Sequence, residues 1–150
     1  MDRIKEGIVE VDGIILSGET TIEDLEKIDI DKAVFRIHQH GYLESIFNHP
    51  IENDGVDFQV SMRITRKGHK VILLDPKLKK PLRDVIDASR EKQEICEEWL
   101  KRNMDIPPTR DTEDGIFYDF PWGHLYCSAA QHIHFGHLEG CILLSFGDDI

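Results

Sequence analysis

Residues 57–65 alternate without exception between apolar and polar side chains, and this segment most constrains what the chain can fold into. The apolar positions are Phe58, Val60, Met62 and Ile64. Successive side chains of a β-strand point to opposite faces of the sheet, so the pattern predicts a strand with one buried and one solvated face. The apolar run at 71–74 predicts a central strand that is covered on both faces. We expect these two segments to pair as a hairpin.

Further strands are expected from short apolar or alternating runs that turn-forming residues separate. They lie at 8–11, 14–16, 32–38, 115–120, 125–129 and 141–146. The Asp12-Gly13 pair is typical of a tight turn between the first two of these strands. The aromatic segment 117–126 favours strand, and Pro121-Trp122-Gly123 within it predicts a bend.

Two helices are predicted. The first covers residues 21–28, where Thr20 and Glu23 match the S/T-x-x-E capping box. The main helix covers residues 89–103, with Ser89 as its N-cap and an apolar stripe that contains Trp99. This order of elements predicts the α+β class: a mostly antiparallel sheet with one long and one short helix packed on one face. A chain of 150 residues is expected to form a single domain, 1–150.

The charge composition excludes several classes of function. The chain has 29 acidic and 18 basic residues and a formal net charge of -11. An acidic excess opposes binding to nucleic acid and to anionic lipid. No apolar run approaches the roughly 18 residues of a membrane span, and the first residues lack the pattern of a signal peptide. We therefore expect a cytoplasmic protein that binds neither nucleic acid nor membrane.

The negative charge is unevenly distributed along the chain. Residues 1–65 carry 14 acids and 6 bases, residues 66–102 carry 7 and 11, and residues 103–150 carry 8 and 1. Two interpretations stay open. The acids form either an ordinary solvated surface or a face that steers a basic partner towards the protein.

The three cysteines give no sign of a cofactor. Cys96, Cys127 and Cys141 are odd in number, and no two of them have the C-x-x-C spacing of zinc and redox sites. We expect three small buried hydrophobic side chains in a reducing compartment, and no cofactor.

The eight histidines support an alternative interpretation. His132, His134 and His137 cluster in sequence, and His38 and His40 are spaced to face the same side of a strand. Catalytic zinc commonly takes three protein ligands, and Asp119 or Glu139 would supply a supporting carboxylate. A metal-dependent hydrolase is therefore one hypothesis. Against it, Gly136 favours a solvated loop, and the chain contains no H-E-x-x-H or comparable signature.

The second half of the chain resembles small bacterial immunity proteins that accompany polymorphic toxins, including those of contact-dependent growth inhibition. Three segments carry the resemblance: Glu98-Trp99-Leu100, the aromatic segment Phe120-Pro121-Trp122-Gly123-His124-Leu125-Tyr126, and the final apolar strand from Gly140 to Phe146. The similarity covers roughly residues 56–146 as an order of elements. It transfers no functional residue to this chain.

The resemblance implies a non-catalytic cytosolic inhibitor that binds one toxin domain and blocks its active site. An acidic inhibitor suits a basic toxin, because it can occupy the electropositive cleft of a domain that acts on nucleic acid. The candidate partner-binding residues are acids of loops and of the C-terminal end: Asp111, Glu113, Asp114, Asp148 and Asp149. A third hypothesis is a homo-oligomer that pairs through an exposed edge strand.

Overall fold

The computed structural model describes residues 1–79, 85–113, 115–128, 133–134, 137–138 and 140–147. This part contains three helices. Two are short, the 3-10 helix η1 (Ile4–Glu6) and α1 (Ile22–Glu26), and one is long, α2 (Val85–Asn103). The strands are β1 (Val9–Val11), β2 (Ile14–Leu16), β3 (Ala33–His38), β4 (Tyr42–Phe47), β5 (Ile51–Asn53), β6 (Val56–Thr65), β7 (Lys70–Pro76), β8 (Arg110–Thr112), β9 (Gly115–Phe120), β10 (Gly123–Ser128), β11 (Ile133–His134), β12 (His137–Leu138) and β13 (Ile142–Phe146).

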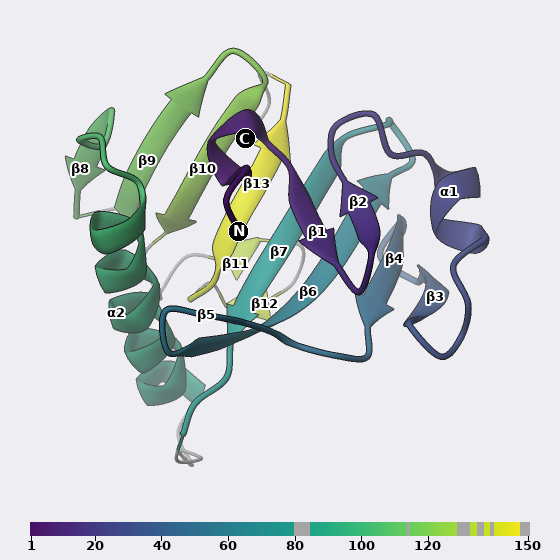
Figure 1. The fold of residues 1–150 in the computed structure, drawn as a ribbon, viewed down its shortest axis with the longest axis horizontal. Coiled ribbons are helices and arrows are strands. Elements are labelled where there is room, and N and C mark those ends of the chain that lie inside the picture. The colour runs from purple at the N-terminus through teal and green to yellow at the C-terminus, as the bar shows by residue number, and fades with distance from the viewer. Residues whose placement is uncertain (80–84, 114, 129–132, 135–136, 139, 148–150) are drawn as a thin grey trace.

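One large antiparallel sheet organises the molecule (Figure 1). Its strand order is β3-β4-β6-β7-β13-β10-β9-β8. Strand β5 also pairs with β6, at residues 56–58, whereas β4 pairs with residues 61–65 of β6. The pairs β1-β2 and β11-β12 form separate two-stranded hairpins. The α+β class and the mostly antiparallel sheet are confirmed.

One face of the sheet carries the main core. The β1-β2 hairpin and the two α-helices cover this face, α2 at one side and the hairpin with α1 towards the other (Figure 1). From the helices, Leu25, Trp99 and Leu100 enter the same cluster of buried side chains as the apolar residues of β6 and β7. The indole of Trp99 meets the Phe58 ring edge-on, with the ring centroids 5.5 Å apart. Both helices therefore pack on one face, as expected.

Strands β6 and β7 pair as the predicted hairpin. The four apolar residues of β6 point into the core, and residues 71–74 of β7 are buried on both faces. The prediction that the polar side of β6 is solvated is wrong at one position. Arg63 is only 7% exposed, because it forms an ion pair with Glu44 on the neighbouring strand β4.

Two predicted turns are confirmed. Asp12 and Gly13 both have positive φ, at 51° and 79°, as the tight turn between β1 and β2 requires. Pro121 and Trp122 form the turn between β9 and β10. At the start of β10, Gly123 has φ 148°, and a Cβ there would lie 2.1 Å from the carbonyl oxygen of Ser145. Only glycine fits this close approach of two strands.

Both helix starts differ from the sequence prediction. The capping box of α1 is one residue later than predicted: Thr21 Oγ1 accepts from Asp24 N at 3.1 Å, and Asp24 accepts from Thr21 N at 2.9 Å. Thr20 lies before this cap and accepts from Ser17 N instead. Helix α2 begins by residue 85, so Ser89 is a buried residue within the helix and not its cap.

Five strands of the described residues were not predicted: β4, β5, β8, β11 and β12. The signal for β5 was present, since Asp54 and Gly55 also have positive φ, at 49° and 79°, in a tight turn to β6. Strand β4 was harder to find, because Glu44 and Ser45 interrupt its apolar pattern and both are buried.

Candidate functional site

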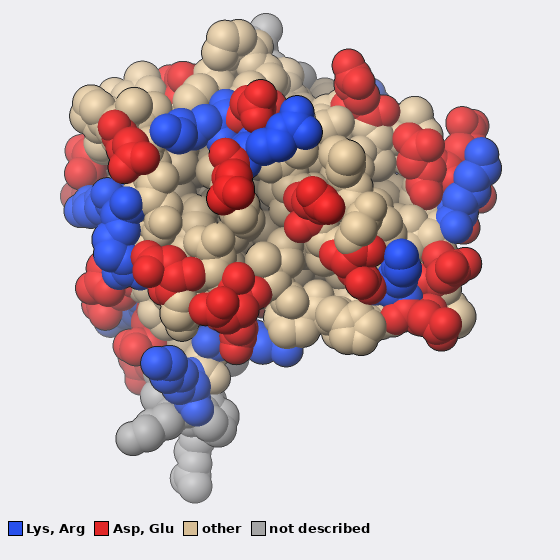
Figure 2. Space-filling model, in the orientation of Figure 1, with Lys and Arg blue, Asp and Glu red and all other residues tan. Residues whose placement is uncertain are grey.

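The N-terminal segment 1–31, here called the acidic layer, concentrates exposed negative charge. It contains ten acidic and three basic residues, a net charge of -7, and every one of the ten acids is exposed. They are Asp2, Glu6, Glu10, Asp12, Glu19, Glu23, Asp24, Glu26, Asp29 and Asp31. Figure 2 shows acidic side chains spread over the face of the molecule on which this segment lies.

The way in which the acidic layer packs explains why its acids point outward. Four of its apolar residues, Val9, Val11, Leu16 and Leu25, are buried in the main core, which leaves the polar positions of the hairpin and of α1 to solvent. Burial of these four side chains stabilises the docked layer by roughly 1.5–3 kcal/mol each. The layer is therefore a fixed surface and not a charged tail.

Specific contacts fix the acidic layer on the sheet. Trp122 donates from Nε1 to the carbonyl oxygen of Lys5 at 2.9 Å, and Lys70 donates from Nζ to the carbonyl oxygen of Gly18 at 2.9 Å. Gly7 has φ 75°, and a Cβ at this position would lie 2.7 Å from the Trp122 indole. The aromatic segment that sequence analysis singled out thus holds the acidic layer in place.

The predicted partner-binding acids lie elsewhere, and the structure describes only some of them. Asp111 in the edge strand β8 and Glu113 after it are both exposed. Asp114, Asp148 and Asp149 lie outside the described residues. Asp111 and Glu113 therefore remain available for binding, at the opposite end of the sheet order from β3.

Two side chains contact the carboxylate of Asp119, one from β8 and one from β10. The His124 ring nitrogen Nδ1 lies 2.6 Å from Asp119 Oδ1, and Arg110 Nη2 lies 3.5 Å from the same oxygen. These contacts, first the hydrogen bond with His124 and then the charge of Arg110, lower the pKa of the Asp119 carboxyl. The carboxylate of Asp119 thus already has His124 and Arg110 as its partners.

The structure describes no side chain of the histidine cluster 132–137. His132 and Glu139 are not described; His134 in β11 is opposite His137 in β12, but neither side chain is described. Among the side chains that the structure describes, no three of His, Cys, Asp or Glu gather closely enough to hold a metal ion. The hydrolase hypothesis stays a prediction that rests on sequence spacing alone.

His38 and His40 do not share a strand as predicted. His38 ends β3, and His40 lies in the turn to β4, where its backbone N–H donates to His38 Nδ1 at 3.2 Å. The two rings stack with their centroids 4.8 Å apart, and His38 also stacks on Tyr42 at 4.3 Å. Stacked rings at a turn form a packing contact rather than a convergent ligand set.

The three cysteines are buried and free, as predicted. Cys96 donates from Sγ to the carbonyl oxygen of Gly140 at 3.5 Å, and Cys127 from Sγ to that of Gln93 at 3.9 Å. Burial, with the neighbouring Cys127 thiol, raises the pKa of Cys96 well above its ordinary value. A protonated buried thiol is a poor nucleophile, so Cys96 suits packing and not catalysis.

A groove of about 680 Å³ lies where α2 meets the β5-β6 turn and the segment after β7. Its lining mixes both signs of charge, with Asp54, Glu91, Lys77 and Arg102 among its residues. Arg102 Nε already pairs with Asp54 Oδ2 at 2.8 Å. The mixed lining selects no single class of ligand.

Comparison of the chain with protein-family models, with curated proteins and with solved structures gives no match in any of the three. Within the part of the chain that the structure describes, no helix is both long and apolar enough to cross a membrane.

Proposed function

We propose that this chain is a non-catalytic binding protein that neutralises a toxic protein domain by covering it. The observation that carries the proposal is the acidic layer, a docked surface that contains ten exposed carboxylates and only three basic residues. Opposite fields raise the rate at which two proteins meet and favour the partner with the complementary sign. The partner we propose is a basic domain, encoded beside this chain and toxic without it.

The distribution of charge within the fold supports a protein partner. Other acids are engaged in fixed contacts, such as Glu44 with two arginines and Asp119 with His124. Three acids of the acidic layer form exposed pairs, namely Asp2, Glu6 and Asp12. Glu10, Glu19 and Glu26 appear in no ion pair among the described residues. Clustered like charges without cationic partners destabilise a fold through repulsion, so a surface of this kind is best explained by a function in binding.

The first test is rescue of growth. Products of the neighbouring genes would be expressed alone and together with this chain, and viable cells counted. We expect one neighbour to be toxic alone and harmless in combination, with the two proteins forming a complex of nanomolar or tighter Kd by isothermal titration calorimetry. A set of neighbours that are all harmless, or a toxic one that this chain neither binds nor suppresses, would contradict the proposal.

The second test locates the binding surface. A triple variant, Glu10→Gln with Glu19→Gln and Glu26→Gln, neutralises part of the acidic layer. We expect it to bind the partner about tenfold or more weakly, with a smaller dependence of Kd on salt, because steering charges act through screened electrostatics. A matched control changes three acids of α2, Glu91, Glu94 and Glu98, to Gln. The double variant Asp111→Asn with Glu113→Gln tests the other predicted surface in the same assay.

A further inference from the structure

Strand β3 ends the large sheet and exposes apolar side chains. It is the outermost strand in the strand order of the described residues, and it pairs there only with β4 (Figure 1). Ile37 in the strand is 75% exposed, Val34 is 45% exposed, and Ile30 just before it is 77% exposed. Val34 and Ile37 project to opposite faces of the sheet, so exposed apolar side chains flank the free edge on both sides, where an added strand would cover them.

The backbone of β3 offers hydrogen bonds on its outer side. Asn48 N donates to the carbonyl oxygen of Lys32, which fixes Lys32 and every second residue after it as the ones bonded to β4. The N–H and C=O groups of Phe35 and Ile37 therefore point away from the sheet. Ala33 is occupied, since its N–H donates to the carbonyl oxygen of Asp29 at 3.1 Å. The open stretch is thus 35–37, where another strand can pair.

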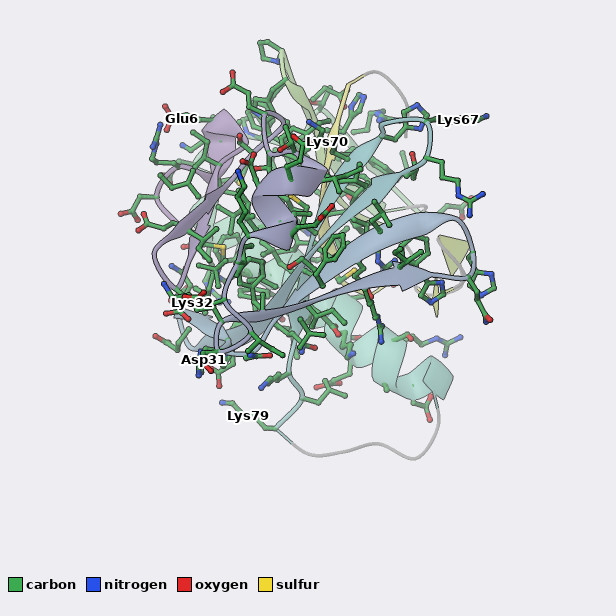
Figure 3. The ribbon with its side chains drawn as sticks, turned by 90° about the vertical axis from the view of Figure 1, so that its right-hand side faces the viewer. Glu6, Asp31, Lys32, Lys67, Lys70 and Lys79 are labelled. Carbon is green, nitrogen blue, oxygen red and sulfur yellow. The ribbon has the colours of Figure 1, made fainter. Side chains whose placement is uncertain are left out.

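Charge decides which kind of strand fits this edge. Figure 3, which views the molecule from this side, shows β3 running from the labelled Asp31 and Lys32. Asp29 and Asp31 are exposed at that end, and the acidic layer continues from them. A second copy of this chain would bring its own net charge of -11 against these acids. The two cations next to these acids already have partners, since Lys32 donates from Nζ to the carbonyl oxygen of Asp12 and Arg36 pairs with Glu44. Asp29 and Asp31 therefore attract a basic strand.

We propose that a strand of a basic partner adds to the sheet at β3, antiparallel to it. Its apolar side chains lie opposite Phe35 and Ile37, and its Lys or Arg residues lie at its C-terminal end, beside Asp29 and Asp31. This mode of recognition takes affinity from main-chain hydrogen bonds and specificity from alternate side chains. The inference rests on the proposed function, because it names the surface through which that partner docks.

The pairing geometry gives a matched pair of probes. In an antiparallel pair, opposite residues share a face, and residues with outward N–H and C=O groups form the hydrogen-bonded pairs. The probe is a capped peptide, Thr-Val-Thr-Val-Thr-Val-Lys-Lys, whose three valines would lie opposite Ile37, Phe35 and Ala33 in that order. N-methylation of the valines blocks the hydrogen bonds to β3, whereas N-methylation of the threonines blocks only groups that face away. A peptide with Glu-Glu in place of Lys-Lys tests the charge.

The experiment is a titration of ¹⁵N-labelled protein followed by NMR. We expect chemical-shift changes concentrated at residues 33–38, and binding at least about tenfold weaker for the valine-methylated and Glu-Glu peptides than for the threonine-methylated one. The protein variant Ile37→Pro, which removes an outward N–H, should weaken binding of the unmodified peptide to a similar extent. The peptide comparison uses unaltered protein, so it holds even if this variant folds poorly.

Four results would overturn the inference. Equal binding of the two N-methylated peptides would exclude strand addition, and shifts confined to the acidic layer would indicate charge attraction alone. A protein that sediments as a dimer, and as a monomer after Ile37→Pro, would assign the edge to a second copy. If the toxic neighbour is still bound and suppressed by Ile37→Pro at full affinity, only the edge inference fails. If the peptide binds at β3 but no neighbour is toxic, only the proposed function fails.

Discussion

Glu44 lies opposite Arg63 in the pairing of β4 with β6, on the face of the sheet away from the main core. It is 2% exposed and accepts from Arg63 Nε at 2.6 Å and from Arg36 Nη2 at 2.9 Å. Burial alone would raise the pKa of Glu44, but the hydrogen bonds from Arg63 and Arg36 outweigh it and hold the pKa below its ordinary value. The ionised carboxylate is thus part of the native packing.

Removing that charge should destabilise the protein. We expect Glu44→Gln to lower the free energy of unfolding by about 3 kcal/mol, because it leaves Arg63 buried without its carboxylate. Urea denaturation at pH 7 measures this. Asp54→Asn serves as a control, since the exposed Asp54–Arg102 pair should contribute little. Equal midpoints for Glu44→Gln and the unaltered protein would contradict the prediction.

The same carboxylate gives the fold a dependence on pH. Since the pKa of Glu44 is lower in the folded state, its stabilisation is fully present above about pH 4.3, the ordinary pKa of glutamate. It is lost as the pH falls through the folded-state value. We expect the unaltered protein to lose stability more steeply than Glu44→Gln does as the pH falls from about 4.3 to about 3. Urea midpoints measured across this range for both proteins would show it; parallel curves would refute it.

Gly123 has no tolerance for a side chain. At φ 148°, a Cβ would lie 2.1 Å from the carbonyl oxygen of Ser145, which belongs to the backbone of β13 and cannot move independently. We expect Gly123→Ala to cost about 3 kcal/mol in thermal or urea unfolding. Gly13→Ala, where φ is also positive but no atom lies within 4 Å, should cost only about 1–2 kcal/mol. A cost at Gly123 no larger than at Gly13 would be inconsistent with this contact.

At the scale of elements, the sequence predicts strands best where side-chain periodicity reports burial directly. Strands β6 and β7 follow that rule, and their hairpin was predicted. Strand β4 breaks it, because a glutamate that two arginines neutralise is as buried as an apolar residue. Its partners are 8 and 19 residues away in sequence, so no local pattern shows the pairing.

The candidate site was predictable only in part. The acidic excess of residues 1–65 is visible in the sequence, but its concentration on one docked layer depends on Trp122 and Lys70, far along the chain. The free edge of β3 could not be foreseen, since strand order is a long-range property that contacts between distant segments decide. Only the structure places Ile30, Val34 and Ile37 along one border.

Strand β3 should tolerate proline at residues whose N–H points outward, and not at residues whose N–H is bonded to β4. Val34 belongs to the residues bonded to β4, so Val34→Pro removes a ladder hydrogen bond and leaves the Ile46 carbonyl unpaired. We expect a loss of about 2 kcal/mol. Ile37→Pro removes an N–H that faces outward and should cost less than about 1 kcal/mol. Urea denaturation of both variants compares them, and the reverse order would contradict the assigned orientation of β3.

At the scale of the whole molecule, charge and stability oppose each other. Ten exposed acids lie within 31 residues, and the apolar side of that segment is fixed to the core, so the acids cannot separate. Their mutual repulsion destabilises the compact state. The α2 region differs, because residues 66–102 carry more bases than acids and its acids have cations nearby in sequence.

This difference predicts opposite effects of the same chemical change. Replacing Glu10, Glu19 and Glu26 by Gln should raise the free energy of unfolding by about 0.5–1 kcal/mol at low salt, with the gain shrinking at 0.5 M NaCl as screening removes the repulsion. Replacing Glu91, Glu94 and Glu98 by Gln should give no gain. Urea denaturation at 20 mM and 0.5 M NaCl measures both.

If the first variant is more stable yet binds its partner more weakly, the acidic layer is retained for binding at the expense of stability. If it is no more stable than the α2 variant at low salt, the acids of the layer do not repel one another appreciably, and their clustering does not indicate a binding surface.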